Sequence, residues 1–497
     1  MRLSRTDGLL VLAFWALACF HVLSHRWGTD ADYWEWEATL REAARDPLHP
    51  GHPILKAEGK LSSRFTPVVV AAGGICRATG LDARRWLDLQ GCVVGLLFPL
   101  GVLAFCRRRW KEPDQGRYTL LALLFLWGLG WQWSGETAWI TLSQTWTYPV
   151  TLALTLMLWT AVAAMRWLEG EGGRFAVLAW LGLLATVTTH PETGAFASLL
   201  LLLLCVEPWR PERILPVLGW AVATWALAFA WPYYSLHGVM FHGVQPGWIE
   251  RNSNFYNWHL MNAGPALLGI PVAFRFARDR REPFLVAGIV TLSLVYAAAS
   301  LQHGELGRIF FYLLFFLHLA AARQLRTWGI LDPSVLAGRF RCGQVFHVSI
   351  AVLALWAFAA AWHLQKATAP LLRNAQESRV QDRYAFLSGK LGSQDVVAVE
   401  PRTGWPLPAL TGARTVALYH RHPLVLDQIR REEDVQAFLS VETRPERRAG
   451  LAGQYGITRV LLREGVDPPP SLFGEELARA GELILVSWDG ARGRPRP

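Results

Sequence analysis

Long apolar blocks separated by short polar stretches run through most of the chain up to His363. Each block has about 15 to 22 residues, the length that an α-helix needs to cross a hydrocarbon core about 30 Å thick. This pattern predicts an α-helical polytopic membrane protein with about eleven transmembrane helices. The blocks cover residues 8–23, 86–105, 118–133, 146–165, 174–189, 192–206, 214–233, 261–277, 283–301, 307–322 and 344–363.

A further apolar block, residues 66–79, is short and contains Gly73, Gly74 and Arg77. We predict that it lies in the membrane interface or re-enters, and does not span. If it spanned, every later crossing would be inverted and the basic loops would lie on the wrong side of the membrane.

Basic residues gather in alternate loops between the blocks. With a cytoplasmic N-terminus, the short outer loops hold only Arg251 and Arg308. Because cytoplasmic loops are enriched in Arg and Lys, this asymmetry predicts a multi-pass inner-membrane protein with an extracytoplasmic C-terminus. The same loops account for the net charge of +10, so we expect no nucleic-acid binding. The cytoplasmic loops hold Arg107, Arg108, Arg109, Lys111, Arg117, Arg166, Arg174, Arg210, Arg213, Arg275, Arg278, Arg280, Arg281, Arg323, Arg326, Arg339 and Arg341.

The composition becomes that of a soluble domain after His363. We therefore predict a transmembrane domain over residues 1–364 and a soluble extracytoplasmic α/β domain over 365–497. The second domain has no glycine-rich phosphate fingerprint and no nucleophile elbow, which favours a structural or substrate-positioning role. Strands are predicted at 395–400, 415–419, 458–463 and 482–488, and helices at 426–441, 444–455 and 472–480, around a partly parallel sheet.

The external loop that follows the first helix, residues 25–65, opens with four carboxylates among aromatic residues: Asp30, Asp32, Glu35 and Glu37. A carboxylate close to the membrane and partly removed from water can act as a general base or hold a divalent cation. The alternative is an ordinary solvated interfacial helix.

Two further polar groups lie near the outer face. His190 and Glu192 flank Pro191 at a tight turn between two crossings, where they can ligate a metal or contact an anionic substrate, or simply form a polar turn. Arg308 lies just inside the outer end of a helix. Its guanidinium suits a phosphate on a lipid carrier, and the alternative is snorkelling to the interface.

This organisation resembles the GT-C superfamily of polyprenyl-phosphate-sugar-dependent glycosyltransferases, which includes protein O-mannosyltransferases and bacterial aminoarabinose transferases. The resemblance covers nearly the whole chain: one helix, a long external loop beginning Asp30-Ala31-Asp32-Tyr33, many crossings and an external C-terminal domain. It is similar in particular to bacterial GT-C-like membrane proteins. The local matches are Trp133-Ser134-Gly135-Glu136, Trp146-Thr147-Tyr148-Pro149, Thr189-His190-Pro191 and Gly307-Arg308-Ile309-Phe310-Phe311.

The resemblance implies inverting transfer of a sugar from a polyprenyl-phosphate donor to a protein, lipid or glycan acceptor at the extracytoplasmic face. By family analogy Asp30 or Asp32 is the base. Because this chain has Asp-Ala-Asp where several relatives have adjacent acidic residues, the choice between them stays open. Arg308, a metal or both would stabilise the phosphate. The implied substrate-binding residues are His190, Glu192, Arg308, Glu136 and Tyr148, and the candidate ligands of a divalent cation are Asp30, Asp32 and His190.

Two other classes of function compete with this hypothesis. A transporter or flippase of a lipid-linked substrate would show inverted repeats and broken helices at the membrane midplane. The ionisable residues gather on one face instead, which favours an interfacial enzyme. The third class is a non-catalytic protein of envelope assembly.

Overall fold

A computed structural model describes residues 3–24, 32–57, 62–129, 135–207, 209–241, 259–302, 307–331, 344–374, 380–422 and 424–489. The chain forms two compact units, each continuous in space but not in sequence. The first unit comprises Met1–Leu23, Gln90–Ala228 and Gln245–Pro370, and the second comprises Ser24–Leu89, Phe229–Val244 and Leu371–Pro497.

The first unit is helical, and every predicted apolar block contains helix. The block predicted at 261–277 is divided between α13, η3 and α14. The division falls at Gly264, which has a φ of +48° and whose added Cβ would lie 2.5 Å from the Cα of Gly128. The helices are α1 (Arg5–Ser24), α4 (Ala83–Trp110), α5 (Gln115–Phe125), α6 (Trp139–Thr145), α7 (Pro149–Leu168), α8 (Gly173–Thr189), α9 (Pro191–Leu203), α10 (Pro211–Phe229), α13 (His259–Ala263), η3 (Gly264–Leu268), α14 (Gly269–Arg278), α15 (Pro283–Gln302), α16 (Ile309–Thr327) and α18 (Gln344–Asn374).

Five helices in the described part of the chain are long and apolar enough to cross a membrane: α1, α4, α7, α10 and α16. Shorter apolar helices, among them α8, α9 and α15, accompany them. Large apolar side chains lie exposed on the helices of this unit, for example Leu215 (77%) and Val222 (69%) on α10 and Leu294 (66%) on α15. In water such surfaces would be costly, whereas lipid covers them without cost.

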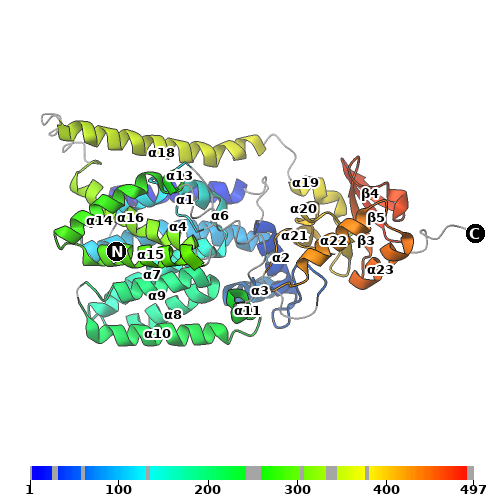
Figure 1. Ribbon diagram of the computed structural model, residues 1–497, viewed down its shortest axis with the longest axis horizontal. Coiled ribbons are helices and arrows are strands. Elements are labelled where there is room, and N and C mark those ends of the chain that lie inside the picture. The colour runs from blue at the N-terminus through cyan, green and yellow to red at the C-terminus, as the bar shows by residue number, and fades with distance from the viewer. Residues whose placement is uncertain are drawn as a thin grey trace, which may run out of the picture. The chain divides into compact units, whose positions relative to one another are not determined.

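Close helix contacts in the first unit depend on glycines. Helices α7, α8 and α9 lie side by side (Figure 1). A Cβ added at Gly182 of α8 would lie 2.3 Å from Oγ1 of Thr160 on α7, and one at Gly194 of α9 would lie 2.4 Å from the Cα of Val187 on α8. The small residues therefore allow these backbones to approach closely.

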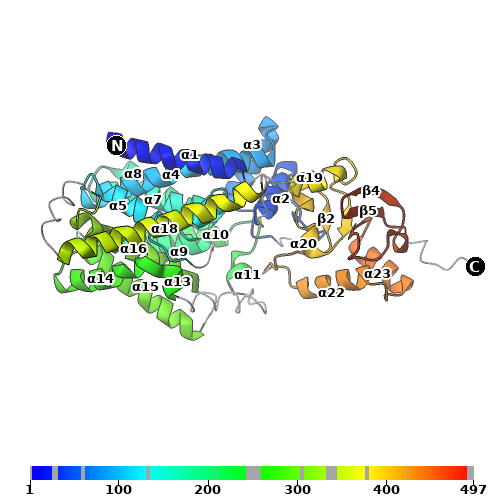
Figure 2. The same cartoon turned by 90° about the horizontal axis from the view of Figure 1, so that it is seen from above.

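The short block predicted at 66–79 is α3 (Pro67–Thr79). Thr66 caps its first turn through Oγ1, and Gly80 ends it with a φ of +71°. At 1.5 Å per residue its 13 residues extend about 20 Å, which is less than a membrane core. Helix α3 packs on α2 (Asp32–Arg45) in the second unit (Figure 2), where a Cβ added at Gly73 would lie 2.5 Å from the Cβ of Ala43.

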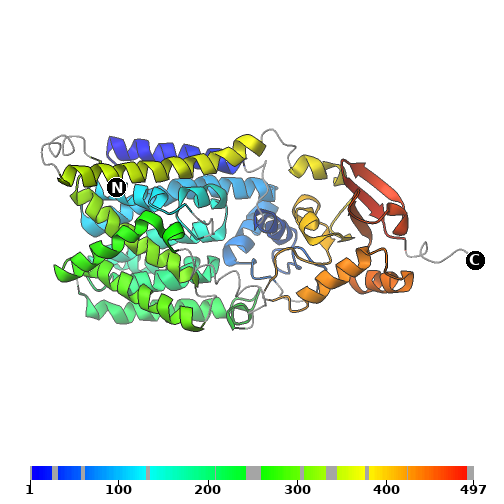
Figure 3. The same cartoon turned by 45° about the horizontal axis from the view of Figure 1, so that its top comes forward.

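The second unit also contains a five-stranded sheet, ordered β2-β1-β3-β5-β4. Its strands nearest the C-terminus are drawn in red in Figure 3. Strands β2, β1 and β3 are parallel, and β5 and β4 continue the sheet antiparallel. At the β2 edge, Leu55 of the first loop forms a parallel bridge with Thr415. The strands are β1 (Val396–Ala398), β2 (Arg414–Thr415), β3 (Arg459–Arg463), β4 (Glu476–Ala480) and β5 (Leu483–Ser487).

Alternate residues of the strands supply two cores, one on each face of the sheet. Val396 and Val460 pack with α22 (Gln428–Leu439) and α23 (Pro445–Tyr455). Val397 and Leu461 point to the other face. Period-2 alternation therefore gives a core on each face of the sheet, in a domain of the α/β class that the sequence predicts. The other face is covered by α19 (Val380–Tyr384), η5 (Ala385–Leu387) and α21 (Leu407–Thr411), and the remaining short elements are α11 (Leu236–Phe241), α20 (Pro401–Gly404) and η6 (Pro470–Leu472).

The prediction of a helix at residues 472–480 is wrong. Only Leu472 is helical, in η6, and Glu476–Ala480 is the edge strand β4, paired antiparallel with β5 through a register shift between Glu476 and Ala478. Helix-forming residues such as Glu, Leu, Ala and Arg misled the prediction. Pairing with the buried strand β5 overrides this weak local preference.

Candidate functional site

Asp32, Glu35 and His420 form a cluster in the second unit, which we call the acid–histidine cluster. Nδ1 of His420 lies 3.0 Å from Oδ1 of Asp32 and 3.3 Å from Oε1 of Glu35. The sequence-predicted partner Asp30 lies outside the described residues. The structure thus places one of the two candidate bases beside a histidine of the C-terminal domain.

Helix geometry explains why two of the four loop carboxylates meet. Asp32 and Glu35 stand three residues apart at the start of α2, so their side chains share one face. Both belong to the first turn, where the helix macrodipole stabilises negative charge. Glu37, two residues beyond Glu35, points away from that face.

The two carboxylates of the cluster have different environments. The side chain of Glu35 is 4% exposed; Oε1 accepts a hydrogen bond of 3.0 Å from the indole Nε1 of Trp405, and Oε2 pairs with Arg64. The side chain of Asp32 is 32% exposed. Glu35 is therefore held in place, and Asp32 is the carboxylate that a ligand can reach.

Charge in the cluster is balanced by His420. Burial alone lowers the pKa of His420, but hydrogen bonds to Asp32 and Glu35 outweigh it and raise the pKa to about 9. The imidazole is therefore protonated at neutral pH and, together with Arg64, balances two carboxylates. His420 directs the Asp32 carboxylate by this hydrogen bond.

The same three side chains fit a divalent cation. One nitrogen and two carboxylate oxygens lie within 4.8 Å of one another. Ions such as Zn²⁺, bound at about 2.0–2.2 Å, hold their ligand atoms roughly 3 to 3.5 Å apart, near the two distances from Nδ1 of His420 to Asp32 and Glu35. A metal at this site would displace the proton from Nδ1 of His420.

The other two acidic residues of α2 form buried ion pairs. Nη2 of Arg84 lies 3.1 and 3.0 Å from the two oxygens of Glu37. Burial raises the pKa of Glu37 to about 7, against the opposing effect of Arg84. Oε2 of Glu42 lies 2.6 Å from Nη2 of Arg414 on β2. Glu42 thus fixes α2 to strand β2, which precedes His420 in the chain.

His52 stabilises the turn after α2. Its Nδ1 accepts hydrogen bonds from the backbone N–H groups of Ile54 (3.1 Å) and Leu55 (2.9 Å), and the residue is 4% exposed. Burial lowers the pKa of His52 well below its usual value, and the nearby His422 and Arg414 act in the same direction. His52 is therefore neutral in the folded protein.

This neutrality predicts a pH dependence of stability. In the unfolded chain a histidine takes up a proton below about pH 6.5, whereas folded His52 does not, so the free energy of unfolding falls as pH drops, by at most about 1.4 kcal/mol per pH unit for this group. In His52→Asn the amide oxygen replaces Nδ1 as acceptor without titrating. We expect the melting temperature of the wild type to fall more between pH 7 and 5 than that of the variant. If the melting temperatures of the two proteins fell equally with pH, His52 would titrate in the same way in the folded and the unfolded protein.

Three of the predicted residues meet in the first unit. Nη1 of Arg308 lies 3.6 Å from Oε2 of Glu192. His190 caps α9: its Nδ1 accepts from the backbone N–H of Thr193 (3.3 Å) and lies 2.9 Å from Oγ1 of Thr193, which contacts the hydroxyl of Tyr312 at 3.0 Å. Because Nδ1 of His190 serves the cap, it is not available to a metal. The roles assigned to His190, Glu192 and Arg308 stay predictions.

Glu136 and Tyr148 lie close to the start of α6 and α7. Glu136 is 2% exposed and its Oε2 accepts a hydrogen bond of 2.8 Å from Oγ1 of Thr141. Tyr148 is the N-cap residue of α7 and is 6% exposed. Their substrate-binding roles also stay predictions.

Sequence reasoning missed His420, Trp405 and Arg64. His420 lies in Tyr419-His420-Arg421-His422, an aromatic and basic run in the predicted soluble domain, and this run is the signal that could have identified it. The contact between Trp405 and Glu35 of α2 cannot be predicted from the local sequence, because the two residues are 370 positions apart.

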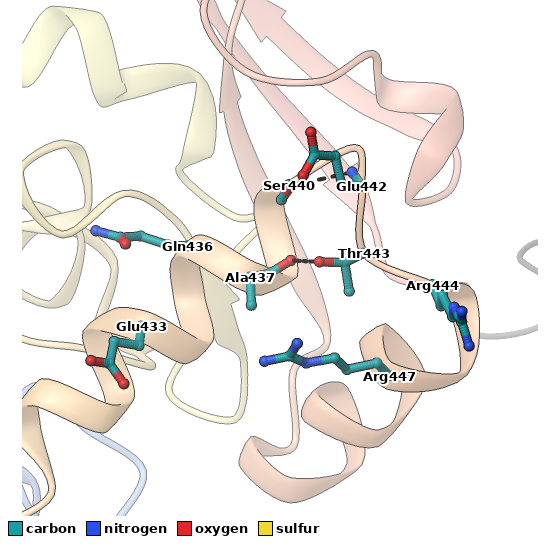
Figure 4. A pocket seen from close by; sticks show the side chains of 8 residues that line it. All are labelled: Glu433, Gln436, Ala437, Ser440, Glu442, Thr443, Arg444 and Arg447. Carbon is teal, nitrogen blue, oxygen red and sulfur yellow. Dashed lines mark hydrogen bonds between the residues drawn. The ribbon is translucent and has the colours of Figure 1, made fainter.

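A hollow lies between α22 and the start of α23, away from the acid–histidine cluster (Figure 4). Its volume is about 550 Å³, and Thr443 Oγ1 donates to the carbonyl of Ala437 at its wall. It shares no residue with the acid–histidine cluster. The lining residues are Glu433, Gln436, Ala437, Ser440, Glu442, Thr443, Arg444 and Arg447.

Comparison with known proteins identifies the fold. No protein-family model matches the chain, and no curated protein matches it in sequence. Among solved structures, the chain is similar to ArnT from Cupriavidus metallidurans in the apo state, which is an aminoarabinose transferase. The TM-score is 0.57 at 15% sequence identity, and the match covers 99% of this chain and 100% of that one. It is also similar to the Archaeoglobus fulgidus oligosaccharyltransferase in the apo form, with a TM-score of 0.50 at 11% identity, over 91% of this chain and 69% of that one.

Both solved structures have the GT-C fold. The predicted fold class and resemblance are confirmed: the chain is an α-helical multi-pass membrane protein with the GT-C fold and a small C-terminal α/β domain.

Proposed function

We propose that this protein is a membrane glycosyltransferase that moves a sugar from a polyprenyl-phosphate donor to an acceptor at the extracytoplasmic face of the bacterial inner membrane, with inversion. The observation that carries the proposal is the likeness in fold to two glycosyltransferases over nearly the whole chain. Fold alone does not fix activity, so the acid–histidine cluster supplies the chemical argument.

In this proposal Asp32 is the general base. Its carboxylate takes the proton of an acceptor hydroxyl as that oxygen attacks the anomeric carbon. The bond between this carbon and the phosphate oxygen breaks, and polyprenyl phosphate leaves with the electron pair. His420 orients the Asp32 carboxylate and balances its charge, and Glu35 orients His420. The contacts of 3.0 and 3.3 Å from Nδ1 of His420 to Asp32 and Glu35 support these roles.

Stabilisation of the leaving phosphate is assigned to Arg308. Its guanidinium pairs with Glu192 at 3.6 Å, which is too long for a hydrogen bond, and 28% of its side chain is exposed. A phosphate offers this planar donor a stronger, bidentate partner than Glu192 does in this geometry.

A divalent cation, if bound, would be held by Asp32, Glu35 and His420. Its positive charge would stabilise the negative charge that develops on the leaving phosphate. We expect the purified wild type to retain about one Zn²⁺ or Mn²⁺ per chain after dialysis against that metal, and His420→Ala to lose at least 90% of it, because the only nitrogen ligand is gone. Metal content by plasma mass spectrometry measures this. Equal content in both proteins would exclude the cluster as the metal site.

The proposed function is tested by incubating wild-type proteoliposomes with a panel of radiolabelled polyprenyl-phosphate sugars and a bacterial envelope extract as the source of acceptors. Label that moves from the lipid to an acceptor supports the transferase. Movement of intact donor across the bilayer without consumption would instead support a flippase.

A further inference from the structure

Three aromatic rings meet beside the acid–histidine cluster: Trp405, Tyr419 and His420. Their centroids lie 4.4 Å apart for Trp405 and Tyr419, 4.7 Å for Trp405 and His420, and 5.2 Å for Tyr419 and His420. Each ring thus contacts the other two, and all three belong to the C-terminal domain of the second unit.

Two of these rings are fixed by the cluster itself. The indole of Trp405 donates to Glu35 at 3.0 Å, and Nδ1 of His420 contacts Asp32 at 3.0 Å. Tyr419 is the outermost ring, with 38% of the residue exposed, and it belongs to neither core of the sheet. A partly exposed aromatic ring therefore lies next to His420, whose Nδ1 contacts the Asp32 carboxylate.

This combination matches the surface of a pyranose. A sugar ring has an apolar face of C–H groups, which packs on an aromatic ring, and an edge of hydroxyl groups, which binds carboxylates. A single exposed tyrosine is ordinary on any protein surface. Here the exposed ring lies next to His420, which contacts the Asp32 carboxylate, and this carboxylate can accept the proton of a hydroxyl group.

We propose that Tyr419 and Trp405 form a binding platform for a sugar ring of the acceptor, so that the acceptor is a glycan or glycolipid and not a protein side chain. The inference rests on the proposed function, in which Asp32 acts on the acceptor hydroxyl. A ring stacked on Tyr419 would extend its hydroxyl edge toward His420 and Asp32, which would place the attacking oxygen beside its base.

The test uses saturation-transfer difference NMR on the full-length protein in nanodiscs, with methyl α-D-glucopyranoside, methyl β-D-galactopyranoside and N-acetylglucosamine as probes. The proteins are the wild type, Tyr419→Ala, Tyr419→Phe, which keeps the ring, and Leu426→Ala, a control that removes another exposed apolar side chain of the same domain (80% exposed).

We expect signal at the C–H protons of at least one glycoside with the wild type, Tyr419→Phe and Leu426→Ala, and its loss with Tyr419→Ala. In the transfer assay, Tyr419→Ala should raise the acceptor KM about five- to tenfold, the size expected for one aromatic contact, with little change in kcat. No signal with the wild type, or equal signal with Tyr419→Ala, would overturn the platform. Because the NMR needs no donor, a platform that binds glycosides in a protein without transfer activity would refute the proposed function alone.

Discussion

Replacing Asp32 with asparagine is expected to lower the rate of sugar transfer by about 10²- to 10⁴-fold, the contribution of a general base, with the protein still folded. Asparagine has the same shape, and its amide oxygen can still accept a hydrogen bond from His420 across the present 3.0 Å. It cannot take a proton from the acceptor. The measurement is the initial rate of label transfer, normalised to the amount of folded protein.

Two variants make this result specific. Asp382→Asn changes an exposed aspartate in the first turn of another helix, α19, and should transfer at the wild-type rate. Asp30→Asn separates the two candidate bases of the sequence. Full activity in Asp32→Asn together with a loss in Asp30→Asn would move the assignment to Asp30.

Replacing Arg414 with methionine is expected to destabilise the second unit by about 3 kcal/mol, because it removes the buried partner of Oε2 of Glu42 and leaves this carboxylate with the half-exposed Arg45, 2.6 Å from Oε1. The side chains of Arg414 and Glu42 are 9% and 4% exposed and lie 2.6 Å apart. Arg414 also donates to the carbonyl of Pro53 at 2.7 Å. Loss of these bonds should release α2 and the following turn from β2.

Thermal unfolding and hydrogen exchange of residues 32–57 measure this effect. Arg383→Met removes an ion pair to Glu482 that is 45% and 52% exposed, and it should cost less than about 1 kcal/mol. The double variant Glu42→Gln/Arg414→Met should lose less than the sum of the two single variants, since neither Glu42 nor Arg414 is left as a buried charge without the other. A loss for Arg414→Met no larger than that for Arg383→Met would show that this pair does not hold α2 to the sheet.

The long helices of the first unit could be predicted from the sequence because membrane thickness sets their length. The block that became α4, for example, has apolar side chains for a full crossing and ends in Arg107, Arg108 and Arg109. The partly parallel sheet also followed from short apolar runs such as Val396–Ala398. The prediction was wrong at 472–480, where the strand partner and not the local sequence decides the structure.

The candidate site could be predicted only in part. Asp32 stands out because it belongs to a run of four carboxylates among aromatic residues, directly after the first apolar block. Its partner His420 lies in an aromatic and basic run, but no periodicity or motif connects this run to the first loop. The buried salt bridge between Glu42 and Arg414 and the turn at His52 bring the two segments together, and both depend on tertiary contacts.

Release of polyprenyl phosphate from a lipid-linked sugar by wild-type and Asp32→Asn proteoliposomes, with the same amount of folded protein, tests the central claim most directly. The predicted result is acceptor-dependent release with the wild type and at least a hundredfold slower release with the variant. Equal rates in the two proteins would contradict the assignment of Asp32 as the base, and no release by the wild type from any donor of the panel would contradict the transferase itself.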